Sequence, residues 1–372
     1  MKVLYVGHYR DHTGYGDAAI RNILALDAAG VDVVCRSIRF NNSNLPLPKR
    51  ILELEQKSEY GANICIQSTL PSYIEYDGHF DKNIVCYYNE TDSFCDSGWE
   101  TKINCMDSAW VACPAMERAA RKSGVKIPID IIPITCDTTL YEEEYEPLDI
   151  PQVNGNFIFY WIGELIHRKN LTAAMVAFHL EFSPSEPVSF IIKANKSGLS
   201  AEQCLNEVQN LSKATKENLR LYGSVDDYAK EIVITKRLSV EEMMRLHATC
   251  HCFLMTGYGA GWNMPAVDAM GIGNTVIANE TGLFEDIGYF NFPAITVPGQ
   301  PEPVIDNPGI PGLHTANETW KRIDITKLRK AMRNEFNASL EYRQEKANRG
   351  LDLMYDFSYE TIGQKMKGLL EQ

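Results

Sequence analysis

Residues 256–286 constrain the fold of this chain more than any other part of the sequence. The run just before them, HCFLM (251–255), is short, apolar and aromatic, and it predicts a buried strand. Four glycines follow within fifteen residues, at positions 257, 259, 261 and 271. Glycine at the end of a strand lets the backbone approach a ligand that a Cβ atom would exclude. The stretch therefore predicts a binding loop.

A helix and a second strand complete this unit. Pro265 suits the first turn of a helix, which we predict over 264–270, and the next strand is predicted over 274–278. A strand, a glycine loop and a helix N-terminus in this order present amide N–H groups and a partial positive charge to an anion, typically a phosphate. Asp268 would lie on the helix, one turn beyond its start.

The first residues of the chain predict a βαβ unit. A strand, a loop, a helix and a strand are predicted at 2–6, 7–16, 17–29 and 31–38. This order is typical of the beginning of a doubly wound domain. Gly14, Tyr15 and Gly16 would lie at the carboxyl end of the first strand, where such sheets bind ligands.

The length of 372 residues exceeds one ordinary core and predicts two α/β domains. We expect a first domain over 1–137, a linker or surface excursion over the acidic stretch 138–154, and a second domain over 155–355. Further strands are predicted at 63–67, 83–88, 109–112, 129–132, 157–162, 189–193 and 231–236. Further helices are predicted at 49–60, 98–107, 115–123, 171–182, 240–248, 325–347 and 356–370, and a loop at 301–311.

A group of charged residues follows the strand predicted at 157–162. Glu164 comes just after the glycine of this strand, and Arg168, Lys169 and Asn170 precede the next helix. Cations at such a position either face solvent or hold an anion. The helix at 240–248 begins with a capping box, Ser239 to Glu242, so that 235–238 would form the loop at the end of the preceding strand.

These features resemble the retaining GT-B glycosyltransferases of the GT4 type, whose donor-binding pattern is Glu-Gly-x-Gly-x-Pro-x-x-Glu-Ala-Met. Residues 260–270 match this pattern as AGWNMPAVDAM, with Asp268 at the second acid and Ala260 at the first. The resemblance is strong over 157–286. It implies an α/β fold of the GT-B kind, in which two Rossmann-like doubly wound domains face each other across a cleft and the C-terminal helix (356–372) crosses back to the N-terminal domain.

The resemblance also implies an activity: transfer of a sugar from a nucleotide-diphosphate sugar to an acceptor hydroxyl, with retention and without a metal or other cofactor. A UDP-sugar is favoured because such donors are frequent. Arg168 and Lys169 would stabilise the departing diphosphate, and Asp268 would accept hydrogen bonds from the ribose. The other candidates for donor binding are Gly14, Tyr15, Gly16, Arg237, Leu238, Gly261, Trp262, Asn263, Met264 and Pro265.

Two positions depart from the family pattern. The family's glutamate at position 260 contacts hydroxyls of the donor sugar and belongs to the catalytic site, whereas Ala260 cannot do so. Three explanations stay open: an unusual donor sugar, a catalytically weak or inactive relative that binds the nucleotide sugar, and an engineered substitution. Many relatives carry an arginine where this chain has Glu164, so diphosphate binding would depend on Arg168 and Lys169.

The acceptor is less well defined. Most relatives modify glycans, lipid-linked sugars or small molecules, and a virus-encoded enzyme acting on hydroxymethylated DNA bases is a rarer alternative. Candidate acceptor-binding residues at the predicted strand ends are His8, Arg10, Asn89 and Glu90, of which the last two could equally form a solvated turn. DNA phosphates could meet Arg36, Arg39, Lys49 and Arg50. The net charge of −13 counts against a strongly basic nucleic-acid groove.

Composition indicates the compartment. No run approaches the roughly 18 apolar residues of a membrane helix, and the first residues lack the long apolar region of a signal peptide. We therefore expect a cytoplasmic protein. Most of the 10 cysteines lie in apolar runs without the spacing of a zinc site, which predicts reduced thiols in the core.

Overall fold

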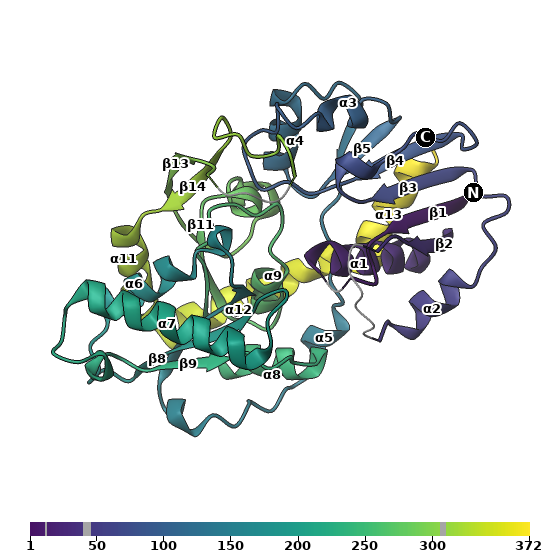
Figure 1. The fold of residues 1–372 in the computed structure, drawn as a ribbon. Helices are drawn as coiled ribbons and strands as arrows, with labels where there is room; N and C mark the ends of the chain where they lie inside the picture. Colours follow the sequence, from purple (N-terminus) through teal and green to yellow (C-terminus); the bar gives the residue numbers. More distant parts are fainter. Residues whose placement is uncertain (12, 40–45, 306–309) are drawn as a thin grey trace.

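The computed structural model describes residues 1–11, 13–39, 46–305 and 310–372. Parts of the loops predicted at 7–16 and 301–311 lie outside these residues. Two parallel six-stranded sheets, each flanked by helices, lie side by side (Figure 1). We call the first sheet with α1–α4 and α13 the first unit, and the second sheet with α6–α12 the second unit. None of the described helices is long and apolar enough to cross a membrane.

The first sheet has the strand order β2-β1-β3-β4-β5-β6, with every neighbouring pair parallel. Its strands are β1 (Lys2–Gly7), β2 (Asp32–Ser37), β3 (Ile64–Ser68), β4 (Lys82–Cys86), β5 (Ser108–Val111) and β6 (Ile129–Ile131). The helices between them are α1 (Gly14–Ala28), α2 (Lys49–Glu55), α3 (Trp99–Ile103) and α4 (Pro114–Lys122). Because both faces of a parallel sheet are covered, its strands are largely apolar, which is why the sequence predicted them.

The second sheet has the order β12-β11-β10-β7-β8-β9, again parallel throughout. Its strands are β7 (Phe157–Glu164), β8 (Val188–Asn195), β9 (Glu231–Ile234), β10 (Cys252–Met255), β11 (Thr275–Asn279) and β12 (Ile295–Val297). One face packs against α6 (Leu171–Glu181), α7 (Ala201–Leu219) and α11 (Ile325–Phe336). The other packs against α8 (Val240–Thr249), α9 (Met264–Gly271) and α12 (Leu340–Met354).

The chain passes between the units twice. The acidic segment 138–154 contains the short helix α5 (Thr139–Glu142) and a 3-10 turn, and it leads from the first sheet into the second. At the other end α13 (Tyr359–Leu370) returns to the first unit and packs along α1, where the Lys367 amine donates to the Ala29 carbonyl oxygen at 3.3 Å (Figure 1). The return of the C-terminal helix to the N-terminal unit confirms the prediction.

Several elements differ from the sequence prediction. Helix α1 begins at Gly14, because Thr13 caps it by accepting from the Gly16 amide, so the glycine pair forms its first turn. The predicted helix 325–347 is two helices, since Ser339 caps a new one. Helix α7 was not predicted, although its capping box, Ser200 with Gln203, is readable in the sequence.

The predicted loop at 301–311 also needs correction. Its first residues belong to strand β13 (Gly299–Pro303), which pairs antiparallel with β14 (Thr319–Ile323). Proline removes a backbone donor and is therefore tolerated in a two-stranded ribbon, where one side of each strand is unpaired. Short helix α10 (Ile287–Phe290) was likewise not predicted. All ten cysteines are free thiols and eight of them are buried, as predicted for core thiols.

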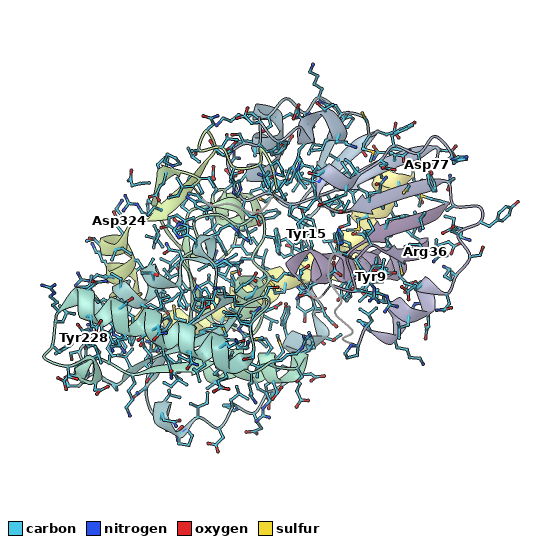
Figure 2. The ribbon with its side chains drawn as sticks, viewed as in Figure 1. Tyr9, Tyr15, Arg36, Asp77, Tyr228 and Asp324 are labelled. Atoms are coloured by element: carbon cyan, nitrogen blue, oxygen red, sulfur yellow. The ribbon has the colours of Figure 1, made fainter. Side chains whose placement is uncertain are left out.

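A buried carboxylate anchors β9 at the edge of the second sheet. Glu231 is 5% exposed in its side chain and lies 2.7 Å from both the His179 Nε2 and the Lys216 Nζ. Tyr228, whose ring meets His179 edge-on at 5.2 Å, marks this region at the outer end of the second unit (Figure 2). Burial alone would raise the pKa of Glu231, but the bonds and charges of His179 and Lys216 outweigh it and lower the pKa to about 2.

This network predicts an acid-sensitive stability. Because the pKa of Glu231 is lower in the folded protein than its ordinary value of 4.5, the pairing stabilises the fold above pH 4.5 and is lost as the pH falls toward 2. Glu231→Gln should reduce the free energy of unfolding at pH 7 by on the order of 3 kcal/mol. Urea unfolding at pH 7 and pH 3 measures this, with Glu217→Gln on the exposed face of α7 as control. An equal loss at both pH values would contradict the assignment.

Candidate functional site

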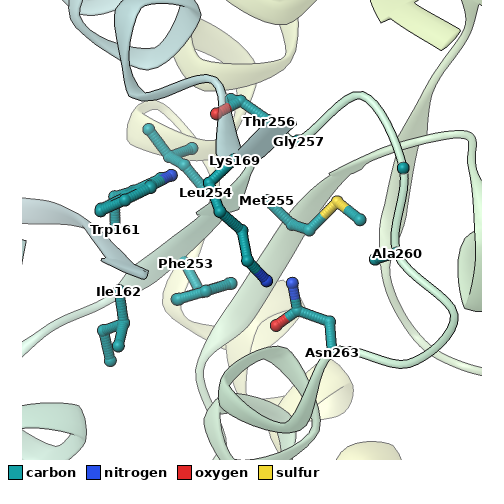
Figure 3. Close-up of a pocket in the computed structure, with 11 residues that line it drawn as sticks. Trp161, Ile162, Lys169, Phe253, Leu254, Met255, Thr256, Gly257, Ala260 and Asn263 are labelled. Atoms are coloured by element: carbon teal, nitrogen blue, oxygen red, sulfur yellow. The ribbon is translucent and has the colours of Figure 1, made fainter. Parts of the chain in front are cut away.

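A small cavity of about 10 Å³ lies at the carboxyl ends of β7 and β10, at the start of α9. Such a volume admits about one water molecule. Three residues that the sequence singled out line it together: Lys169, Ala260 and Asn263. Figure 3 shows the Lys169 amine pointing toward the Asn263 side chain. The cavity is otherwise lined by the apolar ends of the strands and by the glycine loop 256–259.

Lys169 is a partly buried cation whose side chain lines the cavity. Among the residues that the structure describes, no carboxylate lies within the 4.0 Å of an ion pair from its amine. Burial lowers the pKa of Lys169 to about 8, and the neighbouring Arg168 charge acts in the same direction, while Glu90 and Glu164 oppose them. A partly buried cation without an acidic partner is unfavourable by itself and gains from an anionic ligand.

The start of α9 lies beside this amine. Asn263 caps the helix, since its Oδ1 accepts from the Ala266 amide at 3.1 Å. Met264 and Pro265 form the partly buried first turn. Ala260 is 3% exposed and is held by the turn after β11, where Gly282 has φ +54° and a Cβ atom would lie 1.5 Å from the Ala260 carbonyl oxygen. Pro265 has no amide hydrogen, and the Ala266 and Val267 amides donate to Asn263, so this helix start offers the Met264 amide and the positive end of its dipole beside the Lys169 amine.

Arg168 is already engaged. Its Nη1 donates to the Gly259 carbonyl oxygen at 2.9 Å, and its Nη2 lies 3.2 Å from the Glu90 carboxylate of the first unit. The two basic residues that the sequence treated as a pair therefore differ in environment. Lys169 is the cation that is available to a ligand in this conformation, whereas Arg168 connects the two units.

Asp268 has partners that the sequence did not reveal. The Tyr141 hydroxyl donates to its Oδ1 at 2.6 Å, and the Arg21 Nη2 lies 3.4 Å away. Burial raises the pKa of Tyr141, and the Asp268 charge raises it further. Tyr141 comes from α5 and Arg21 from α1, so no local pattern pointed to either of them. The side chain of Asp268 is 12% exposed, and a ribose would have to share it with these donors.

The candidates in the first unit have different environments. Tyr15 donates through its hydroxyl to the Tyr88 carbonyl oxygen at 2.9 Å, on the side of the first unit that faces the second (Figure 2). His8 is buried, with its Nε2 2.6 Å from the Thr69 hydroxyl, and burial lowers its pKa. Arg10 pairs with Glu55 of α2. Asn89 donates to the Thr91 carbonyl oxygen at 2.8 Å.

The remaining candidates line other surfaces. Arg237 is exposed and Leu238 buried in the loop between β9 and α8. The Trp262 ring packs against Phe290 and Phe357, with ring centroids 5.7 and 5.8 Å apart, and so contributes to the core. Three of the four basic residues considered for DNA phosphates are paired with acids: Arg36 with Glu59, Lys49 with Glu53, and Arg50 with Asp27 and Glu53.

Comparison with known proteins defines the class of fold. No protein-family model matches the chain, and no curated protein matches it. Solved structures match the chain along its whole length. Its two parallel sheets and the returning C-terminal helix form the GT-B fold, as predicted.

Three of these structures illustrate the likeness. Sucrose-phosphate synthase from Thermosynechococcus elongatus is 16% identical, with a TM-score of 0.66 and coverage of 100% of this chain and 98% of that chain. HepE of Anabaena, in complex with UDP and glucose, is 14% identical, with a TM-score of 0.66 and coverage of 100% and 99%. Trehalose-6-phosphate synthase OtsA is 11% identical, with a TM-score of 0.67 and the same coverage.

Proposed function

We propose that this protein is a glycosyltransferase that moves a sugar from a UDP-sugar to an acceptor hydroxyl. The observation that carries the proposal is the Lys169 amine in the cavity, without an acidic partner among the described residues, beside the start of α9. The residue match at 260–270 and the shared fold support it. Solved structures of this fold hold UDP-glucose or UDP-2-fluoro glucose, which favours a UDP donor.

The proposed reaction breaks the bond between the anomeric carbon and the diphosphate oxygen, and the electron pair leaves on the diphosphate. The acceptor oxygen forms the new bond to the anomeric carbon, and its proton passes to the departing diphosphate. Lys169 and the α9 N-terminus stabilise the negative charge that develops on this leaving group. We propose retention of configuration and no metal or other cofactor, on the resemblance alone.

The roles in binding are proposed by the same reasoning. The nucleotide sugar lies against the second unit (155–355), with its diphosphate at Lys169 and its ribose at Asp268. Asp268 can accept from a ribose hydroxyl in addition to the Tyr141 hydroxyl, because a carboxylate has about four acceptor positions. The acceptor, a glycan or a small molecule, docks on the first unit (1–137 with the C-terminal helix).

A thermal-shift screen tests the proposal. UDP should raise the melting temperature more than GDP or ADP, because at equal concentration a ligand that binds only the folded state stabilises it more the more tightly it binds. Incubation with labelled UDP-glucose then separates turnover from binding, since release of UDP shows a transferase or slow hydrolase. Binding of UDP-glucose without release of UDP would instead indicate a protein that only binds the nucleotide sugar. No shift with any of these nucleotides would overturn the proposal.

A further inference from the structure

The glycines on either side of Ala260 lie against the backbone of the first unit. A Cβ atom on Gly259 would lie 2.0 Å from the Glu90 carbonyl oxygen, and one on Gly261 would lie 2.9 Å from the Asn89 carbonyl oxygen. These two residues can therefore only be glycine while the units are in contact as observed. The consequence is that Glu90, which follows β4 in the first unit, lies against Gly259, the residue just before Ala260 in the chain.

The Glu90 side chain is held at this place by Arg168. Its Oε1 lies 3.2 Å from the Arg168 Nη2, and the same guanidinium is fixed to the glycine loop through the Gly259 carbonyl oxygen. The Glu90 side chain is 33% exposed, so it is neither sealed in the interface nor free in solvent. A carboxylate has about four acceptor positions, and of the residues that the structure describes only Arg168 pairs with this one, which leaves positions open to hydroxyl groups.

A carboxylate of the first unit is thus fixed to the glycine loop one residue from position 260, where this chain has an alanine in place of the glutamate of the donor-binding pattern. We propose that Glu90 supplies, from the opposite unit, the carboxylate that Ala260 lacks, and that it accepts hydrogen bonds from the hydroxyls of the donor sugar. This inference rests on the proposed function and assigns Glu90 to the donor instead of the acceptor. Because Glu90 and the cavity belong to different units, the sugar is held in this way only when the units are closed.

The first experiment compares UDP-glucose with UDP. Glu90→Gln keeps the size of the side chain and removes its charge. The affinity for UDP-glucose should fall about tenfold relative to the affinity for UDP, because a hydrogen bond to a charged group is lost. Isothermal titration calorimetry gives the dissociation constants of UDP and UDP-glucose. The rate of UDP release from UDP-glucose should fall as well.

Glu285→Gln is the matched control. Glu285 also joins the two units, through Arg118 at 3.0 Å, and its side chain is equally 33% exposed. Glu285→Gln should leave the ratio of the affinities for UDP-glucose and UDP unchanged. If Glu90→Gln weakens UDP and UDP-glucose equally, Glu90 is only a contact between the units and the inference is wrong. An unchanged ratio of the affinities for UDP-glucose and UDP in Glu90→Gln would also overturn it. So would a wild-type protein that binds UDP-glucose no more tightly than UDP. A wild-type protein that binds neither compound would contradict the proposed function itself.

Placing a glutamate at position 260, as in the family pattern, gives an independent test. In the wild type, Ala260→Glu adds a second negative charge beside Glu90 and should lower UDP-glucose affinity. In a Glu90→Ala background the same change should restore it toward the wild-type value, because one carboxylate is again present. Loss of affinity in both backgrounds, with an unchanged melting temperature, would count against the inference. If Ala260→Glu lowers the melting temperature, this substitution disturbs the fold. The comparison of UDP and UDP-glucose affinities in Glu90→Gln then decides whether the inference holds.

Discussion

Lys169→Ala should weaken the binding of UDP-glucose by about tenfold or more, because a hydrogen bond to a charged group contributes roughly 1.5–3 kcal/mol. A loss of affinity of this size is expected because the Lys169 amine lies in the cavity at the start of α9 and has no acidic partner among the described residues. Lys213→Ala is the control, since Lys213 is 64% exposed on α7. Unchanged affinity in Lys169→Ala would mean that the diphosphate does not bind at this amine.

The same lysine predicts a pH dependence. Because the pKa of Lys169 in the folded protein is about 8, its amine loses its proton as the pH rises through this value. The affinity for UDP should therefore fall between pH 7 and pH 9 in the wild type. Lys169→Arg should remove this dependence, since a guanidinium stays charged throughout. A pH profile that is identical in the two proteins would assign the titration to another group.

Gly259→Ala should reduce transfer on the order of a hundredfold, because a misplacement of about 1 Å at a reacting site costs this much. The added Cβ atom would lie 2.0 Å from the Glu90 carbonyl oxygen, so the two units could no longer meet as they do here. UDP binding to the second unit alone should change much less. Gly288→Ala is the control, because apart from its chain neighbours no heavy atom of the described residues lies within 4 Å of its added Cβ.

The measurement for Gly259→Ala is the rate of UDP release from UDP-glucose at saturating donor, together with the radius of gyration in solution. We expect a lower rate and a larger radius. Full activity at an unchanged radius would show that the contact between Gly259 and Glu90 is not required for the reaction. This result would also remove the reason for placing Glu90 next to the donor sugar.

Sequence patterns predicted those parts of the fold that depend on neighbours along the chain. Buried parallel strands are short apolar runs, and the unit around 256–286 combines such a run with glycines and a proline at fixed positions. The pattern failed where a helix was interrupted without a change of periodicity, at Ser339, and where prolines lie within the ribbon β13–β14. Helix α7 was missed in spite of its capping box.

The sequence by itself determined the two-sheet architecture and brought Lys169, Ala260 and Asn263 to one site, because each lies just beyond the end of a strand, and the ends of parallel strands meet at one edge. Only the tertiary structure decided which charged and polar groups meet. The contacts of Arg168 with Glu90 and of Asp268 with Tyr141 join residues from different parts of the chain. Such contacts follow from how the units pack against each other, and packing depends on the shapes of whole surfaces, which no local pattern records.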